Sequence, residues 1–179
     1  MRVLSIFLFV LLAVQMSEQT VTAQIPQAEM QALIQLARAG DVAAQAQLGY
    51  NFQKGIGVAQ SAAEALKWYR RAADQGHARS QSNLGFMYVK GWGVAKSYAE
   101  ALTWYRRAAD QGLVTAQNNL GFMYARGRGV PKDLTQAYMW YALAKAVRAM
   151  AHLEPSMTGP QIAEAKQRAA NWKRAHEKD

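Results

Sequence analysis

The sequence contains no cysteine, which excludes a disulfide scaffold, a thiolate metal site and a cysteine nucleophile. Histidine is scarce: His77, His152 and His176 are the three, and none stands at metal-ligand spacing to another histidine or to a pair of carboxylates. No phosphate-binding loop, dinucleotide fingerprint or nucleophile motif occurs. We therefore predict no cofactor, no metal and no catalysis, and we keep a hydrolase only as the remote alternative.

Acidic residues are also in short supply. The chain has 12 Asp and Glu against 21 Lys and Arg, a formal net charge of +9. A surplus of this size favours acidic proteins, envelope polymers, lipid head groups or nucleic acid as partners, although it also serves solubility alone. The oligomeric state is left open by the sequence.

Long apolar runs are missing except at the start of the chain. Arg2 precedes an almost wholly apolar run from Val3 to Val14, which is too short to span a bilayer comfortably. The small residues of Val21-Thr22-Ala23 suit signal peptidase, so we predict that residues 1–23 are a signal peptide cleaved between Ala23 and Gln24. The expected location is periplasmic or secreted, and an uncleaved membrane anchor is the alternative.

Short motifs recur at a constant interval of 36 residues. The recurring pairs are Leu48-Gly49, Leu84-Gly85 and Leu120-Gly121, and Trp68-Tyr69, Trp104-Tyr105 and Trp140-Tyr141. The pattern Gly55-x-Gly57-Val58 recurs in the same way. Chance does not produce such agreement, so the sequence predicts a tandem array with units at about 44–79, 80–115 and 116–151.

Each unit predicts two helices. Ala44, Leu48 and Phe52 form one apolar stripe, and the glycine pattern after them ends the helix. The expected first helices cover residues 43–54, 79–90 and 115–126, and the second helices cover 62–75, 98–111 and 134–152. Helices over 26–39 and 160–176 should cap the two ends, which gives an all-α chain of eight helices with one domain over 24–179.

The pattern A-x-x-x-L-G-x-x-[YF]-x-x-G-x-G-V, followed by E-A-L-x-W-Y-R-R-A-A-x-x-G, resembles the Sel-one-like repeat, a relative of the tetratricopeptide repeat, over about residues 40–145. Ser80 departs from the alanine found at Ala44 and Ala116. The resemblance implies a right-handed α/α superhelical solenoid that serves as a scaffold or adaptor in protein complexes and is often exported in bacteria. A cysteine-rich branch linked to β-lactams carries paired cysteines that this chain lacks, so that activity is not transferred.

The first helices carry the candidate binding surface. At 100° per residue, positions 47, 50, 51 and 54 and their equivalents fall on a different face of the helix from the core stripe. In tetratricopeptide-like solenoids the first helices line the concave surface. The candidate groove residues are Gln47, Asn51, Lys54, Asn83, Phe86, Met87, Lys90, Asn119, Phe122, Met123 and Arg126. Amides, adaptable apolar side chains and cations suit a peptide with acidic groups. The alternative is that Tyr50, Phe86 and Phe122 only pack between repeats.

Three further recurring features have structural interpretations. Arg70-Arg71 and Arg106-Arg107 should pair with Asp74 and Asp110 at i+4 from the first arginine, and the third unit lacks them, which weakens nucleic-acid binding. Glu64, Glu100 and Gln136 should be solvated, salt-bridging positions. Gln45, Gln81 and Gln117 should form a repeated interhelical hydrogen bond. The function predicted is an exported module that binds a protein or peptide; the alternative is a binder of an anionic envelope polymer.

Overall fold

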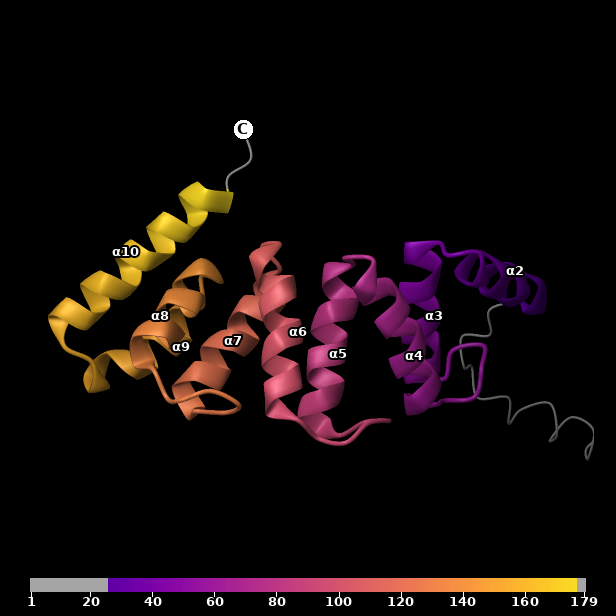
Figure 1. The fold of residues 1–179 in the computed structure, drawn as a ribbon, viewed down its shortest axis with the longest axis horizontal. Helices are drawn as coiled ribbons and strands as arrows, with labels where there is room; N and C mark the ends of the chain where they lie inside the picture. The colour runs from indigo at the N-terminus through magenta and orange to yellow at the C-terminus, as the bar shows by residue number, and fades with distance from the viewer. Residues whose placement is uncertain (1–25, 177–179) are drawn as a thin grey trace, which may run out of the picture.

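The computed structural model describes residues 26–176, so the predicted leader lies outside the described residues. Within residues 26–176 the chain forms nine α-helices, one short 3-10 turn and no strand. The helices are α2 Gln27–Arg38, α3 Val42–Lys54, α4 Ala62–Asp74, α5 Ala78–Lys90, α6 Tyr98–Asp110, α7 Val114–Arg126, α8 Leu134–Leu143, α9 Val147–Leu153 and α10 Gly159–His176, with η1 at Glu154–Ser156. They lie side by side along the long axis, from α2 at one end to α10 at the other (Figure 1).

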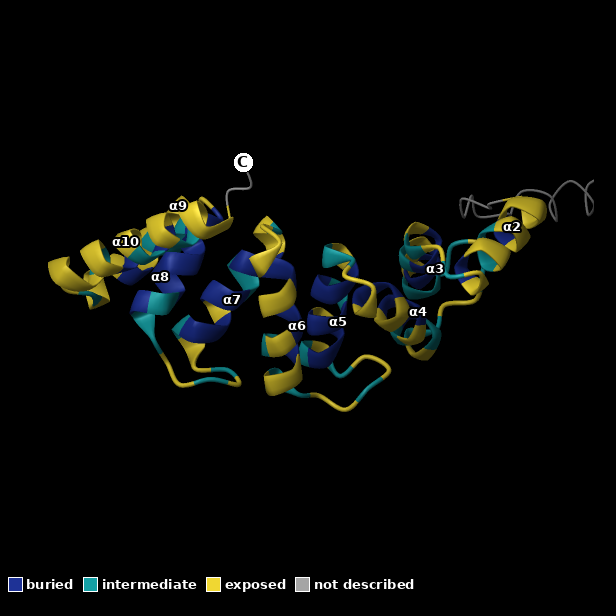
Figure 2. Cartoon of the chain, turned by 45° about the horizontal axis from the view of Figure 1, so that its top comes forward, coloured by how far each residue is buried: buried dark blue, intermediate teal, exposed yellow. Residues whose placement is uncertain are grey.

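The helices pair as the repeats predict. Helix α3 packs against α4, α5 against α6, and α7 against α8, and each pair contacts the next through α4 with α5 and α6 with α7. Figure 2 shows the result: the helices turn buried sides toward their neighbours and leave exposed sides outward. One apolar core runs from Ala65 to Ala169, and a smaller cluster around Leu48 joins α2 to the array. This architecture is a linear stack in which each unit depends on its neighbours.

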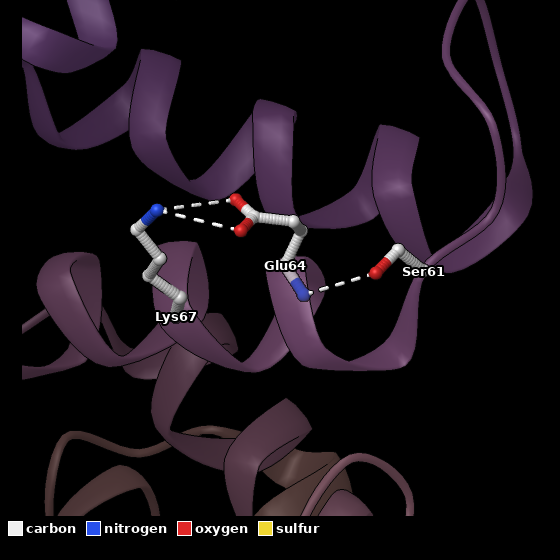
Figure 3. A network of polar contacts seen from close by, with 3 residues as sticks. All are labelled: Ser61, Glu64 and Lys67. Atoms are coloured by element: carbon white, nitrogen blue, oxygen red, sulfur yellow. Dashed lines mark hydrogen bonds and ion pairs between the residues drawn. The ribbon is translucent and has the colours of Figure 1, made fainter.

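Local sequence signals set the helix limits. The second helices begin at Ser61, Ser97 and Asp133, whose side chains accept hydrogen bonds from the backbone N–H three residues later. Figure 3 shows the first of these caps, where the Glu64 N–H donates to Ser61 Oγ at 3.2 Å. The first helices end at glycines in the left-handed conformation, with φ of 74° at Gly55 and 71° at Gly91. Each unit is therefore bounded by the residues that recur in the sequence.

The Leu-Gly pairs mark where the two helices of a unit touch. Leu48, Leu84 and Leu120 are fully buried. A Cβ atom added at Gly49, Gly85 or Gly121 would lie 2.7, 2.7 and 2.6 Å from a ring carbon of Tyr69, Tyr105 and Tyr141 respectively. The tyrosine ring fills the space that a side chain would need, which confirms that these glycines permit close helix approach.

The recurring glutamines form the predicted interhelical hydrogen bonds. Gln45 Nε2 donates to the Ala37 carbonyl at 3.1 Å, and Gln81 Nε2 donates to the Ala73 carbonyl at 3.0 Å. Gln117 Nε2 donates to the Ala109 carbonyl at 3.4 Å. The amide oxygens of Gln45 and Gln81 accept from Gln75 and Gln111, at 2.8 Å each. Each buried amide nitrogen thus bonds to the helix before it in the chain, and the oxygens of Gln45 and Gln81 bond to the glutamine after the second helix of their own unit. The residues involved are Gln45, Gln81, Gln117, Gln75, Gln111 and three alanine carbonyls.

One helix prediction is wrong. Residues 134–152 do not form a single helix, because α8 ends at Leu143 and α9 begins at Val147. Lys145 adopts a left-handed φ of 55°, and the Ala146 N–H donates to the Tyr141 carbonyl at 2.9 Å. No glycine or proline marks this turn, so local propensity gave no signal for it. The break lets α10 pack across α8, where the Trp172 ring meets the Trp140 ring edge-on at 6.1 Å.

Candidate interaction surface

Three aromatic side chains stay exposed at equivalent positions of the first helices. Tyr50 on α3, Phe86 on α5 and Phe122 on α7 are 43%, 36% and 40% exposed. Stacked repeats turn equivalent positions into a row, so side chains 36 residues apart in sequence become neighbours along the array. We call this set the aromatic row. Exposed aromatic rings repeated in register mark a surface where apolar groups of a partner would lose contact with water.

Cations lie over two of the three rings of the aromatic row. Lys90 Nζ is 5.5 Å from the centroid of the Phe86 ring, and the guanidinium carbons of Arg126 and Arg128 are 6.0 and 5.0 Å from that of Phe122. Lys90 and Arg126 are exposed, as is Lys54 at the equivalent position of α3. A cation above an aromatic face is attracted by the ring quadrupole and remains available to an anion. The row therefore combines apolar area with positive charge.

Two residues of this surface lie in the glycine turns and were missed in the sequence. Trp92 is 45% exposed, and its ring meets the Phe86 ring edge-on at 5.3 Å. Arg128 occupies the equivalent position one unit later and reaches the Phe122 ring. The signal available was that the residue between the two glycines changes from Ile56 to Trp92 to Arg128 while its neighbours stay constant.

Three of the predicted groove residues are core residues instead. Asn51 and Met87 are fully buried and Met123 is 2% exposed, so the prediction that they line an open groove is wrong. The reason is helix geometry: each follows the buried leucine of its Leu-Gly pair by three residues, and residues at i and i+3 share a face. The stripe exposed in all three units holds positions 50 and 54 and their equivalents, and position 47 is exposed in the first unit alone.

The predicted amide positions are used partly inside the protein. Gln47 is exposed, and its Nε2 donates to Asn51 Oδ1 at 2.8 Å. Asn83 and Asn119 are half-buried. Burial and the neighbouring Tyr50 raise the pKa of Tyr69, and the nearby Asn83 side chain opposes that shift, while the Tyr69 hydroxyl donates to Gln53 Oε1 at 2.8 Å. Asn83 therefore lies beside Tyr69 at the junction of α4 and α5, with one side left toward solvent.

The arginines of the second helices are engaged in contacts between and within units. Arg70 donates to the Tyr88 hydroxyl, and Arg106 donates to the Tyr124 hydroxyl. The guanidinium carbons of Arg71 and Arg107 each lie 4.7 Å from the centroid of a tryptophan ring, Trp68 and Trp104 respectively. The predicted ion pairs with Asp74 and Asp110 are absent from residues 26–176. The arginines therefore contact aromatic residues of the same unit or the next unit, and not those carboxylates.

Of Glu64, Glu100 and Gln136, which were predicted to be solvated salt-bridging positions, Glu64 forms an ion pair. Lys67 Nζ is 3.3 Å from Glu64 Oε2, an exposed ion pair within α4 (Figure 3). The other ion pair of the described part of the chain joins Arg168 to Glu164 on α10 at 2.7 Å. Pairs of this kind on exposed helix surfaces contribute little to stability.

Neither a metal centre nor a membrane span stands out among the described residues. Residues 26–176 hold no group of three or more His, Asp or Glu side chains placed to bind a metal ion. None of the helices in that range is long and apolar enough to cross a membrane.

Tandem helix pairs that stack through one continuous core, with the same packing glycine in each, define an α/α solenoid of repeats. The chain belongs to the Sel1 repeat family, whose pattern matches residues 42–77, 78–113 and 114–146. The third match ends at the break after α8. Sel1 repeat proteins generally act as scaffolds for protein–protein interaction.

Two solved structures share this fold. A Sel1 repeat protein from Oxalobacter formigenes is 32% identical with a TM-score of 0.68, over 81% of this chain and 62% of that one. A protective antigen of uropathogenic Escherichia coli strains, described as displaying an SLR fold, is 26% identical with a TM-score of 0.63, over 82% of this chain and 41% of that one. The chain thus spans less than two thirds of either relative. A comparison with curated proteins found no match.

Proposed function

We propose that this protein is an exported scaffold that binds a protein or peptide segment along the aromatic row. The observation that carries the proposal is the exposure of an aromatic ring at one repeat position in all three units, at Tyr50, Phe86 and Phe122. The other exposed large apolar side chains of the repeats are Trp92, Val114 and Val147, and none of them recurs as an exposed ring in every unit. In the architecture of the family, the first helices that bear this row line the concave side of the solenoid.

The chemistry of the surface supports a peptide ligand that carries both apolar and acidic groups. Aromatic rings supply contact area at low entropic cost, and the cations Lys90 and Arg126 beside them attract carboxylates. The half-buried amides of Asn83 and Asn119 have the donor and acceptor that a peptide backbone requires. An extended segment lying along the row would meet these groups once per unit.

A binding experiment with matched variants tests this surface. Phe86→Ser with Phe122→Ser removes two rings of the row, and Leu36→Ser with Val114→Ser removes two apolar side chains of similar exposure outside it. We expect the first pair to weaken capture of partners from envelope extract by about tenfold or more, and the second pair to leave it unchanged. Equal losses in the two double variants would contradict the proposal.

An anionic envelope polymer is the second candidate, favoured by the exposed cations Lys54, Lys90 and Arg126. A salt series separates the two candidates. Binding to a polymer through charge alone falls steeply as salt screens the cations, whereas a peptide that buries apolar groups on the aromatic row keeps part of its affinity. Loss of all binding at high salt would favour the polymer.

Export is proposed on the leader sequence, and the Escherichia coli relative described as a protective antigen is compatible with it. Mass spectrometry of the protein from its native envelope should find Gln24 or a neighbouring residue at the N-terminus. Full-length protein that begins at Met1 and stays in the cytoplasm would refute export.

A further inference from the structure

The aromatic row ends at a pocket of about 550 Å³. Phe122 lines this pocket and is also the last ring of the row, so the two features are continuous. The other walls come from the C-terminal end of α7, the loop after it, α8 and α9. A segment that follows the row toward the C-terminal end of the solenoid would therefore arrive at this pocket.

The break after α8 creates the pocket. Helix α9 packs against α8 in the way that α7 packs against α6, so it takes the place of the first helix of a fourth unit. With seven residues it is much shorter than the 13-residue first helices, and α10 packs against α8 instead of completing a regular pair. The space beside α7 is thereby left open. The repeat pattern of the sequence does not predict this space.

The charged side chains that line the pocket are all basic. They are Arg126, Lys132 and Arg148, with His152 placed one helical turn after Arg148 on the same face of α9. None of the three permanent cations makes an ion pair within residues 26–176. Positive charges gathered in a concave site without a carboxylate raise the local concentration of anions.

The two nearest carboxylates in the sequence are directed to other partners. Asp133 Oδ1 accepts from the Gln136 N–H at 2.9 Å and so caps α8. Glu154 Oε1 accepts from the Tyr138 hydroxyl at 2.9 Å. Neither Asp133 nor Glu154 lines the pocket, so its cations are left to a ligand.

Two aromatic residues, Phe122 and Tyr141, also line the pocket. Burial raises the pKa of Tyr141, and the positive charge of Arg126 opposes that shift, which places the guanidinium within electrostatic reach of the hydroxyl. The centroid of the Phe122 ring is 6.0 Å from the guanidinium carbon of Arg126. Arginine held against aromatic rings keeps its planar donor fork in place for a carboxylate.

We infer that the pocket between α7, α8 and α9 binds the carboxylate side chains of an acidic peptide segment whose apolar residues lie on the aromatic row. The inference rests on the proposed function and names the chemistry of its partner. An acidic peptide fits better than a uniform polyanion, because the pocket opens onto exposed rings that only a ligand with apolar groups would cover.

The test uses a fluorescein-labelled peptide that alternates phenylalanine with pairs of glutamate, and the same peptide with glutamine in place of glutamate. Anisotropy measures binding to the protein and to two single variants of equal charge. Arg148→Gln removes a cation from the pocket, and Arg79→Gln removes an exposed cation of α5 outside it. Lys132→Gln, in the loop, provides a second pocket variant should Arg148→Gln fail to fold.

We expect the glutamate peptide to bind about tenfold less tightly to the pocket variants, as for loss of one charge-assisted hydrogen bond, and to bind normally to Arg79→Gln. The glutamine peptide should bind more weakly than the glutamate peptide and show no difference between variants. Equal weakening by Arg148→Gln and Arg79→Gln would overturn the inference, because charge alone would then explain binding. The polyanion dextran sulfate provides a second check. If Arg148→Gln weakens the binding of dextran sulfate as much as it weakens the binding of the glutamate peptide, the inference is overturned as well.

The two proposals fail separately. If the Phe86→Ser, Phe122→Ser variant loses the partner and the pocket variants do not, the aromatic row remains the binding surface and the pocket has no part in it. If the pocket variants lose the glutamate peptide while the row variant keeps its envelope partners, the proposed function is wrong and the anion site stands.

Discussion

The first and second helices of each unit both carry aromatic and basic residues, but they use them differently. On the second helices, Arg106 is bonded to Tyr124 of the next unit and Arg107 lies over the buried Trp104. On the first helices, Lys90 and Arg126 lie over rings that remain exposed. The difference shows that a basic residue indicates a binding surface only when the group it contacts is itself accessible.

The glycines that join the two kinds of helix offer the most severe way to break this arrangement. Gly85→Val should lower the free energy of unfolding by at least about 2 kcal/mol, because the added side chain would overlap the Tyr105 ring. Gly159→Val is the control, since no atom lies within 4 Å of a Cβ built there. Urea denaturation followed by circular dichroism measures both. If Gly85→Val unfolds at the same urea concentration as the parent protein, the assigned helix packing is wrong.

The amides test whether the first-helix surface binds. Asn83→Ala with Asn119→Ala should weaken partner binding by roughly 1 kcal/mol for each lost hydrogen bond and change the melting temperature little. Arg106→Gln with Arg107→Gln, on the second helices, should affect binding less. Isothermal titration with the captured partner gives both values. If the arginine variant loses binding and the asparagine variant does not, the binding surface lies on the second helices.

The contact between Arg106 and Tyr124 tests whether the arginines of the second helices stabilise the fold. A double-mutant cycle with Arg106→Met and Tyr124→Phe should give a coupling of about 0.5–1 kcal/mol in unfolding free energy, because the pair links two units. The exposed pair of Glu64 and Lys67 should give about 0.3 kcal/mol in the same analysis. Coupling no larger than that of the exposed pair would mean that the second-helix arginines are not structural.

The starts of the helices differ as well, and this gives the smallest predicted effect. Each second helix is capped by the side chain of a serine or an aspartate, whereas α5 is capped by His77, whose Nδ1 accepts from the Ser80 N–H at 3.3 Å. Burial, together with the charge of Arg79, lowers the pKa of His77. The neutral form is therefore favoured in the folded state, and stability falls as the pH drops through the ordinary histidine pKa of about 6.5 toward the lower folded value.

Denaturation at about pH 7.5 and pH 5.5 checks this effect. His77→Asn keeps a capping side chain that does not titrate, so it should lose less stability at the lower pH than the parent does. His152→Asn, at an exposed position of α9, serves as the control. An identical pH response in His77→Asn and the parent would exclude His77 as its source.

The repeat, the limits of most helices, the packing glycines and the glutamine bonds were predictable from the sequence, because each depends on residues within one 36-residue period. The turn at Lys145 was not predictable, since Lys145 takes a left-handed φ of 55° at a position where such a turn usually has glycine. The burial of Met87 and Met123 was open to a stricter reading of helix geometry. The pocket beside α7 depends on the break after α8, where the regular repeat ends. The partners of Arg70 and Arg106 were not predictable because both an aspartate at i+4 and a tyrosine of the next unit were within reach, and spacing alone does not choose between them.

The glutamine bonds also distribute rigidity unevenly along the solenoid. Within each of the first two units, the glutamine after the second helix, Gln75 or Gln111, donates to the amide of Gln45 or Gln81 on the first helix, but the equivalent position of the third unit is Val147, which is 69% exposed. Local opening in a linear array begins where the link between neighbours is weakest. Amide hydrogen exchange should therefore be fastest in α9 and slow progressively toward α5, so the segment that lines the anion pocket would be the part of the chain that reorganises most easily around a ligand.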